Sequence, residues 1–379
     1  MILQSKNVYI DEQLQPCQIV IEGHKITALL PYDSKPCVDY GDAIILPGLI
    51  DMHNHGYLGG QADKATKEWL KLWTDYLPAE GVTSTMFCFS CADLNDLLNC
   101  LKTLDEFIQE GHEGTQIAGV YSEGPFVGLK PGAQNLDYMI IPDAQWIDKF
   151  NEACGGRMNY VMIAPEMLDG NYDVIRYCVD HGIRVAIGHS GATFDICKEA
   201  INAGATSFTH TYNGMSGLHH REPGVLGAAM YFDQCYCELI SDGIHVHPVA
   251  ANLLAKMKGK DKLMLVTDSV SVKGLKPGYH ALNGLELIIG DDGSVKMPDG
   301  TICGSCNRLN KVLKTAIETA HIDPVTAYNA VCKNPYEFLG INTKGKISVG
   351  YDADLVVFDQ NYDVLDTFIL GCRFEKVTQ

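Results

Sequence analysis

The sequence predicts an α/β protein, a (β/α)8 barrel of the TIM type with a small β-sandwich domain built from both ends of the chain. Three observations support this prediction. Short apolar runs recur between residues 43 and 268, segments with helical periodicity separate them, and alternating strand-like segments occupy both flanks. A doubly wound parallel sheet is the alternative for the central part, because it also alternates strands with helices.

Eight apolar runs are the candidate barrel strands. Each is apolar on both faces, as a parallel strand covered by helices must be. They are residues 43–51, 82–89, 117–124, 160–166, 184–189, 207–211, 236–241 and 262–268. Helical spacing of apolar residues follows at 69–77 and 94–104, and Asp93 can cap the second of these helices. Thr193 opens a further helix and Gly204 closes it.

The flanks read as short alternating strands separated by turns. We therefore predict a small β domain with its N-terminal part at residues 1–46, an inserted part at 279–300 and a C-terminal part at 339–379. The (β/α)8 barrel, which we expect to be the catalytic domain, then comprises residues 47–278 and 301–338.

The bulk composition limits the function classes. The chain has 379 residues, of which 46% are hydrophobic and 20% charged, as in a globular protein. No signal-peptide pattern begins it and no apolar run reaches the ~20 residues of a membrane span, so we expect a cytoplasmic protein without membrane contact. A net charge of −18 argues against a nucleic-acid partner. It allows a small anionic substrate, which needs only a few local cationic groups.

The 14 cysteines are scattered without regular spacing, which favours reduced thiols over a disulfide framework. Two Cys-x-x-Cys pairs occur, Cys88 with Cys91 and Cys303 with Cys306. They stand too far apart in the chain for a zinc ribbon.

The stretch LPGLIDMHNHG at residues 46–56 ends an apolar run with two histidines. Side chains at i and i+2 of a strand leave the same face, with Cα atoms about 6.5–7 Å apart. His53 and His55 can therefore meet one metal ion. The alternative is a pair of solvated loop histidines.

Other strands also end in residues of metal-ligand type, namely Glu123, His189, His210 and Asp268. Each alone has a structural explanation, as a histidine satisfied by backbone or as a capping carboxylate. The carboxyl ends of barrel strands meet at one face, however, and imidazole and carboxylate are the ligands of catalytic divalent ions. The set therefore predicts a metal centre at the mouth of the barrel.

Nine short motifs occur in a fixed order. They are PGLIDMHNHG at 47–56, SEGPF at 122–126, APE at 164–166, GHSGAT at 188–193, FTHTYNGM at 208–215, HHREPG at 219–224, SDGIHVHP at 241–248, VTDS at 266–269 and GTICGS at 300–305. This ordered set resembles the amidohydrolase superfamily and, within it, the N-acetylglucosamine-6-phosphate deacetylase family. The closing stretch GKISVGYDADLVVFD resembles the usual ending of the superfamily.

The resemblance implies a metallo-dependent hydrolase barrel that removes the N-acetyl group of N-acetylglucosamine 6-phosphate in amino-sugar catabolism. Glu123, His189 and His210 match the metal ligands of the family. His53 and His55 match a pair found in members that resemble two-metal enzymes. Two divalent ions, zinc or iron, are therefore implied, with Glu123 bridging them.

The resemblance also assigns catalytic and substrate-binding residues. Asp268 matches the base that takes a proton from water and returns it to the leaving amine. Gln134 stands where many members carry histidine, and its amide can still donate a hydrogen bond to an oxyanion. Arg221 matches a phosphate-side arginine, whose guanidinium suits phosphate. The positions that match substrate-contacting segments are Ala133, Gln134, Asn213, Gly214, Arg221, Asp242, Gly243, Ile244, His245, Ile302, Cys303 and Gly304.

The family is typically a homodimer, with the partner chain near the phosphate pocket. Three alternatives are open. The first is a structural or interaction protein, which would bind no stoichiometric metal, and the other two bind the same substrate class or the same metals. In those two the chain is an amidohydrolase for another N-acyl or cyclic amide substrate, against which Arg221 argues, or it is a non-catalytic sugar-phosphate sensor. The sequence leaves open the native metal, the acceptance of N-acetylgalactosamine 6-phosphate, and the roles of His219, His220 and His247.

Overall fold

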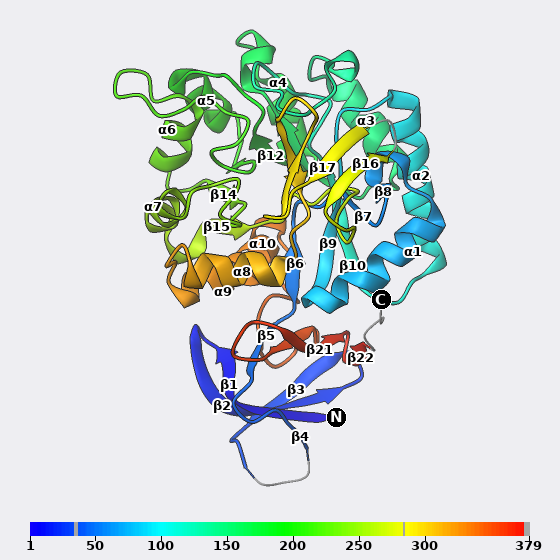
Figure 1. Ribbon diagram of the computed structural model, residues 1–379, viewed down its shortest axis with the longest axis vertical. Helices are drawn as coiled ribbons and strands as arrows, with labels where there is room; N and C mark the ends of the chain where they lie inside the picture. Colours follow the sequence, from blue (N-terminus) through cyan, green and yellow to red (C-terminus); the bar gives the residue numbers. More distant parts are fainter. Residues whose placement is uncertain (34–36, 283–284, 375–379) are drawn as a thin grey trace.

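The computed structural model describes residues 1–33, 37–282 and 285–374. Each of the three predicted segments of the small domain also includes positions outside these ranges. The chain forms a large body of strands ringed by helices and a smaller β body below it (Figure 1). Strands from the two ends of the chain lie together in the smaller body.

The large body is the predicted barrel. Its eight strands follow one another in chain order, and each neighbouring pair is parallel. They are β6 (Leu49–Asp51), β9 (Val82–Phe89), β10 (Gln116–Ser122), β11 (Met158–Ile163), β12 (Arg184–Ile187), β13 (Ser207–Phe208), β14 (Tyr236–Leu239) and β15 (Leu263–Leu265). A parallel bridge between Asn54 and Ser269 joins the first strand to the last at the mouth. The barrel prediction is confirmed, and the doubly wound alternative is wrong.

Helices cover the outside of this sheet. They are α1 (Lys67–Tyr76), α2 (Leu94–Glu110), α3 (Ala144–Ala153), α4 (Asp173–Asp180), α5 (Phe194–Asn202), α6 (Gly224–Tyr231), α7 (Pro248–Lys258), α8 (Leu309–Glu318), α9 (Pro324–Val331) and α10 (Lys333–Leu339). Short 3-10 helices occur at Ala62–Lys64, Leu77–Glu80, Leu136–Tyr138, Pro165–Leu168 and Gly259–Asp261. Asp93 and Thr193 cap α2 and α5 through their side chains, as predicted. Among the helices that the structure describes, none has the length and apolar character to cross a membrane.

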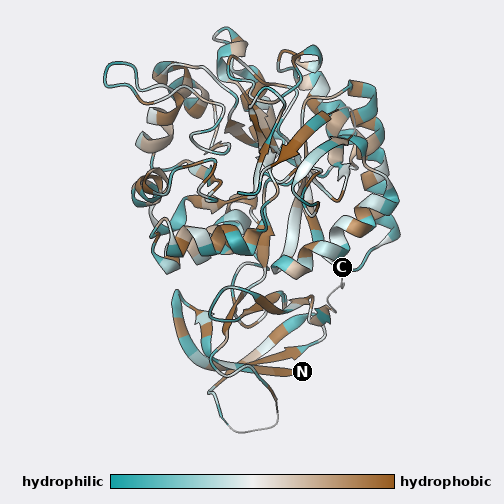
Figure 2. Cartoon of the chain, in the orientation of Figure 1, coloured by the Kyte–Doolittle hydropathy of each residue, from teal (hydrophilic) through white to brown (hydrophobic). Residues whose placement is uncertain are grey.

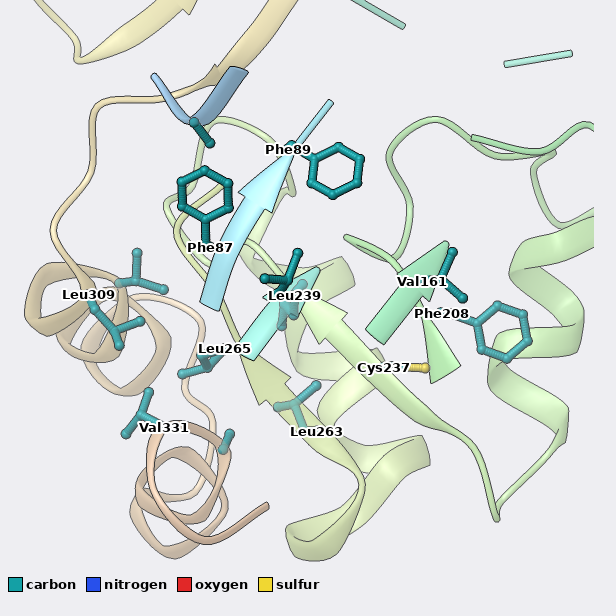
Figure 3. Close-up of a cluster of buried hydrophobic side chains, with 14 of the residues drawn as sticks. Phe87, Phe89, Val161, Phe208, Cys237, Leu239, Leu263, Leu265, Leu309 and Val331 are labelled. Carbon is teal, nitrogen blue, oxygen red and sulfur yellow. The ribbon is translucent and has the colours of Figure 1, made fainter. Parts of the chain in front are cut away.

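Alternating side chains of the strands build two separate cores. Phe87 and Phe89 of β9 belong to the cluster between strands and helices (Figure 3), and each is fully buried. Met86 and Cys88, the alternate residues, belong to the cluster inside the barrel. Figure 2 shows the consequence, with hydrophobic strands inside the large body and hydrophilic residues on the outer helical faces. Burying one such phenylalanine contributes about 1.5–3 kcal/mol.

The smaller body is one eight-stranded sheet made from both ends of the chain. Its strands are β1 (Ile2–Ile10), β2 (Gln13–Glu22), β3 (Lys25–Leu30), β4 (Val38–Asp39), β5 (Ile44–Pro47), β20 (Leu355–Phe358), β21 (Val364–Ile369) and β22 (Cys372–Phe374). The antiparallel pair of β5 and β20 joins the N-terminal and C-terminal parts. The Tyr9 hydroxyl donates to Asn329 Oδ1 of α9 at 2.9 Å and ties this sheet to the barrel.

The predicted strand at 43–51 is two strands in the structure. β5 belongs to the terminal sheet and β6 to the barrel, and the break falls at Gly48. A β-carbon at Gly48 would collide with the side chain of Thr83, so only glycine lets the two bodies join this closely.

The predicted inserted part of the small domain, residues 279–300, pairs differently from the expectation. Strands β16 (Gly278–Leu282), β17 (Leu285–Ile289), β18 (Ser294–Lys296) and β19 (Ile302–Ser305) form an antiparallel sheet of their own. This sheet lies on the barrel (Figure 1), where Ser305 bridges to Ser269. It packs its own small core, which includes Val272, Leu287 and Val295. Alternation predicted these strands correctly, but it cannot say which sheet they join.

Candidate active site

A cavity opens where the barrel strands end. The metal-ligand candidates His55, Glu123, His189 and His210 line it together with Asp268. The predicted substrate residues that line it are Ala133, Gln134, Asn213, Gly214, His245, Ile302, Cys303 and Gly304. The sheet of residues 278–305 forms one wall, because Ile302, Cys303 and Gly304 belong to β19. The predicted residues therefore converge on one place from many parts of the chain.

Glu123, His189 and His210 form the first group of possible metal ligands. Glu123 Oε1 lies 2.9 Å from His189 Nε2 and 3.0 Å from His210 Nε2, and the two ring nitrogens are 3.1 Å apart. The Nδ1 atoms face the carbonyl oxygens of Lys130 and Asn213 at 2.9 and 3.2 Å. A carbonyl only accepts, so each Nδ1 carries a proton, and in the neutral form of each ring Nε2 then presents a lone pair. Three acceptors thus face one point, and a cation fits there.

His53 and His55 form a second group of the same kind. Their Nε2 atoms are 3.0 Å apart, and Asp268 Oδ1 lies 3.6 and 3.3 Å from them. His53 Nδ1 donates to Glu238 Oε2 at 2.9 Å, and His55 Nδ1 donates to the carbonyl of Cys88 at 3.0 Å. Both Nε2 lone pairs therefore face each other and a carboxylate, an arrangement that also fits a cation.

Glu123 lies between the two groups. Its Oε1 faces the first group, and its Oε2 is 3.4 Å from His55 Nε2. Burial alone would raise the pKa of Glu123, but the charge and hydrogen bond of His189 outweigh burial and hold this pKa well below its usual range. Burial likewise opposes charge on His189, and Glu123 outweighs it and raises the pKa of this histidine. The cluster therefore attracts positive charge, which a proton or a metal ion can supply.

Gln134 is held against this centre. Its Nε2 donates to Glu123 Oε2 at 2.5 Å, and its Oε1 accepts from the backbone N–H of Cys91 at 2.8 Å. An amide nitrogen carries two hydrogens, so one remains for a substrate oxygen in the cavity.

Three site residues have a left-handed backbone, which non-glycine residues rarely adopt. The φ angles are 43° at His189, 27° at His210 and 49° at Asp268. Each follows the end of a barrel strand, so the chain turns sharply where its side chain enters the mouth. The backbone N–H of Asp268 donates to the His53 carbonyl at 2.9 Å. Burial raises the pKa of Asp268, but the charge of His53 and the hydrogen bond and charge of His55 together outweigh burial, and the net shift is downward.

His245 aims one nitrogen into the cavity. Its Nδ1 bonds to Asp242 Oδ2 at 2.7 Å, while the backbone N–H groups of Ile244 and His245 both donate to Asp242 Oδ1 at 2.8 Å. Burial lowers the pKa of His245, but the hydrogen bond that its ring donates to Asp242 and the negative charge of Asp242 together outweigh burial and raise that pKa. Among the described residues, none bonds to the buried Nε2 of His245. This nitrogen is therefore available to a ligand.

The family model described as "Amidohydrolase family" matches residues 44–374. The chain belongs to the amidohydrolase family. The resemblance stated from the motifs is thereby confirmed.

Named relatives of this amidohydrolase cover most of its length. N-acetylglucosamine-6-phosphate deacetylase of Bacillus subtilis is 35% identical over 90% of this chain and 87% of its own. N-acetylgalactosamine-6-phosphate deacetylase of Escherichia coli O157:H7 is 31% identical over 98% of both chains. A structure of a mutant N-acetyl-D-glucosamine-6-phosphate deacetylase from Mycobacterium smegmatis, in complex with N-acetyl-D-glucosamine 6-phosphate, aligns with a TM-score of 0.90 at 28% identity, over 99% of both chains.

Four of the predicted substrate-binding residues do not line the cavity of this amidohydrolase, and neither does the predicted metal ligand His53. Asp242, Gly243 and Ile244 lie beside it, where Asp242 holds His245. Arg221 lies on the exposed loop before α6, which projects from the large body (Figure 1), and its Nη1 contacts His220 Nε2 at 2.8 Å. Neither lysine nor arginine occurs among the described residues that line the cavity.

Sequence reasoning missed Glu238, which is fully buried within β14. Its Oε2 accepts from His53 Nδ1 and from the backbone N–H of His210, and its Oε1 accepts from the Tyr160 hydroxyl at 2.9 Å. A signal was present, because a single carboxylate in an otherwise apolar strand is costly to bury without a partner. Glu238 thus positions two of the amidohydrolase's possible metal ligands.

Proposed function

We propose that this amidohydrolase hydrolyses the N-acetyl group of N-acetylglucosamine 6-phosphate to give glucosamine 6-phosphate and acetate, in the breakdown of amino sugars. One observation carries the proposal. Two pairs of histidines share Glu123 at the floor of a cavity, and Asp268 contacts the second pair. The relative from Bacillus subtilis, which bears the name of this activity, supports the substrate.

Two divalent ions per chain, zinc or iron, form the proposed cofactor. Glu123, His189 and His210 would hold one ion, while His53 and His55 would hold the other together with Glu123. In both groups the Nδ1 atoms are committed to a carbonyl or a carboxylate, and the Nε2 atoms face one another, which supports this loading. Such ions polarise a carbonyl and lower the pKa of water to about 7.

The chain's own groups move the proton. Asp268 takes a proton from water as the water oxygen bonds to the acetyl carbon. It then gives this proton to the sugar nitrogen as the C–N bond breaks, so that acetate and a free amine leave. The lowered pKa of Asp268 keeps this carboxyl ionised, so that it is free to accept a proton. The spare hydrogen of Gln134 points to stabilisation of the developing oxyanion.

The remaining cavity residues would hold the sugar. His245 presents a nitrogen hydrogen to an oxygen of the substrate, and the backbone around Asn213, Gly214 and Cys303 borders the cavity. The proposed contact residues are Ala133, Gln134, Asn213, Gly214, Arg221, Asp242, Gly243, Ile244, His245, Ile302, Cys303 and Gly304. Among them, Asp242, Gly243 and Ile244 lie beside the cavity, and we propose that they support His245.

A homodimer follows as a further proposal. A phosphate group needs a fixed cation, yet neither lysine nor arginine lines the cavity among the described residues. Arg221 stands on an exposed, projecting loop, where it can reach the cavity of a second copy.

A cytoplasmic location is supported by the 14 cysteines, all of which are free thiols.

The test is acetate release from N-acetylglucosamine 6-phosphate, N-acetylgalactosamine 6-phosphate and unphosphorylated N-acetylglucosamine, with metal content measured on the same sample. We expect release from the first substrate, loss of activity on chelation, and little release from the unphosphorylated sugar. Faster release from the galactosamine compound would favour the second candidate, to which the Escherichia coli relative points. Two bound metals without release from any of the three would overturn the substrate and leave the metal centre standing.

A further inference from the structure

Cys88 points into the barrel at the mouth. It is the seventh of eight residues in β9, and side chains alternate along a strand. Its neighbours Phe87 and Phe89 face the helices (Figure 3), so Cys88 faces the interior, where it is fully buried. Sequence reasoning treated Cys88 only as half of a Cys-x-x-Cys pair and gave it no role.

The thiol lies beside the second pair of histidines. Cys88 Sγ is 3.8 Å from His55 Nε2, and the possible ligand atoms of His53, His55 and Cys88 lie within 4.8 Å of one another. A tetrahedral zinc with Zn–S near 2.3 Å and Zn–N near 2.0–2.1 Å places sulfur and nitrogen about 3.5 Å apart. The Cys88 sulfur and the His55 nitrogen are therefore only about 0.3 Å farther apart than in such a site.

The two imidazoles are already oriented for this ligation. His53 Nδ1 is committed to Glu238 and His55 Nδ1 to the backbone carbonyl of Cys88, so both Nε2 lone pairs face the space beside the sulfur. Both histidines are at least nine-tenths buried. The same residue, Cys88, thus orients one ligand through its carbonyl and offers another through its thiol.

We propose that the Cys88 thiolate is a protein ligand of the metal ion held by His53 and His55. This inference rests on the metal centre proposed above and adds a sulfur ligand to it. On binding, the thiol loses its proton to solvent and the sulfur bonds to the ion, so one proton is released for each ion bound.

A thiolate changes which ions this position selects. Soft sulfur favours zinc, iron and cobalt over magnesium and manganese, which prefer oxygen. We therefore expect the His53–His55 position to stay empty in magnesium or manganese alone. The other position, with Glu123, His189 and His210, contains no sulfur.

The experiment replaces the native metal with cobalt and records the near-ultraviolet spectrum, with metal content determined on the same sample. A thiolate–cobalt charge-transfer band in the wild-type protein, lost in Cys88→Ser, is the expected result. Cys303→Ser is the matched control, because Cys303 lines the same cavity and burial raises its pKa to about 12, which keeps it a thiol. We expect the Cys303→Ser protein to retain the band.

The outcomes separate the two proposals. Protein that binds no metal overturns the metal centre itself. Two bound cobalt ions without the band, or a band that survives Cys88→Ser, overturn the sulfur ligand alone. X-ray absorption of the wild-type zinc protein needs no variant: a sulfur shell near 2.3 Å supports the proposal, and a shell of nitrogen and oxygen only refutes it.

Discussion

The buried carboxylate of Glu238 offers a sharp test of how the metal centre is supported. It accepts hydrogen bonds from His53 Nδ1, from the backbone N–H of His210 and from the Tyr160 hydroxyl. In Glu238→Gln the amide oxygen can keep the bonds from both histidines. The amide nitrogen can then donate to Tyr160, whose hydroxyl also has Ser207 as a neighbour at 3.0 Å. All bonds survive in this variant, and only the negative charge is lost.

The magnitude follows from that difference. Mutation of the residue that bonds to the far nitrogen of a metal-ligating histidine typically weakens metal affinity by about 10–100-fold, and the charge of a carboxylate there raises the basicity of the ligand. We expect that loss in Glu238→Gln, with the free energy of unfolding of the metal-free protein little changed. In Glu238→Ala the donors of His53 and His210 lose their acceptor. Each buried unsatisfied donor costs about 1–3 kcal/mol, so unfolding should become easier by roughly 2–6 kcal/mol.

The assay combines chelator competition for metal affinity with urea unfolding of the metal-free protein. Glu166→Gln is the matched control, because Glu166 is another carboxylate of the barrel body, but it follows β11 and bonds to Ser190 and the backbone N–H of Gly191. It should leave metal affinity unchanged. If Glu238→Gln binds both ions as tightly as the wild type, the carboxylate does not support the ligands and the reasoning is refuted.

Three further predictions concern the reaction and its pH range. Asp268→Asn should keep both metals and lower kcat by about 10²–10⁴-fold, the usual contribution of acid–base catalysis; substantial activity at full metal content would remove Asp268 from its role. Dialysis against a chelator should lower the Tm by several degrees, and zinc should restore it, because a ligand at 1,000 times its Kd stabilises by about 4 kcal/mol; calorimetry that records no shift would contradict the fit of a cation. The raised pKa of His245 means that its charged form is complete below the ordinary value near 6.5 and is lost as the pH rises through the raised value, whereas the lowered pKa of Asp242 keeps that carboxylate charged until the pH falls through the lowered value. KM for the sugar phosphate should therefore increase on the alkaline side, at a lower pH in Asp242→Asn; a KM profile identical in both proteins would contradict this pairing.

The barrel could be predicted because its physical signature is local. A strand covered on both sides must be apolar on both faces, and eight such runs stand in the sequence. The runs extended past the observed strands, as at 184–189 against Arg184–Ile187. The extra residues there are Gly188 and His189, where the chain leaves the sheet and enters the site. The partners of β16–β19 and the break at Gly48 depend on contacts between distant segments, which no local pattern contains.

The part of the site that lies at the strand ends could also be predicted from the sequence. The topology brings every strand end to one mouth, so ligand-type residues at those ends had to meet. Glu238 and Cys88 escaped because they lie within strands, where the register decides whether a side chain faces the helices or the barrel interior. Arg221 was assigned by motif alone, and its exposure follows from the course of a loop.

Charge explains why these separate features belong together. Three buried carboxylates, Glu123, Asp268 and Glu238, contact the four imidazoles, which would be neutral when they bind a metal ion. Isolated charges are too costly to bury, so the three negative charges require compensation. With the Cys88 thiolate the total becomes four negative charges, which two divalent ions balance in full. Replacing Glu238 or Cys88 by a neutral side chain leaves one positive charge in excess. The penalty should fall on the ion at His53 and His55, because Glu238 bonds to His53 and Cys88 lies beside His55. Both variants should therefore release that ion first in a chelator titration, while the ion at His189 and His210 stays bound.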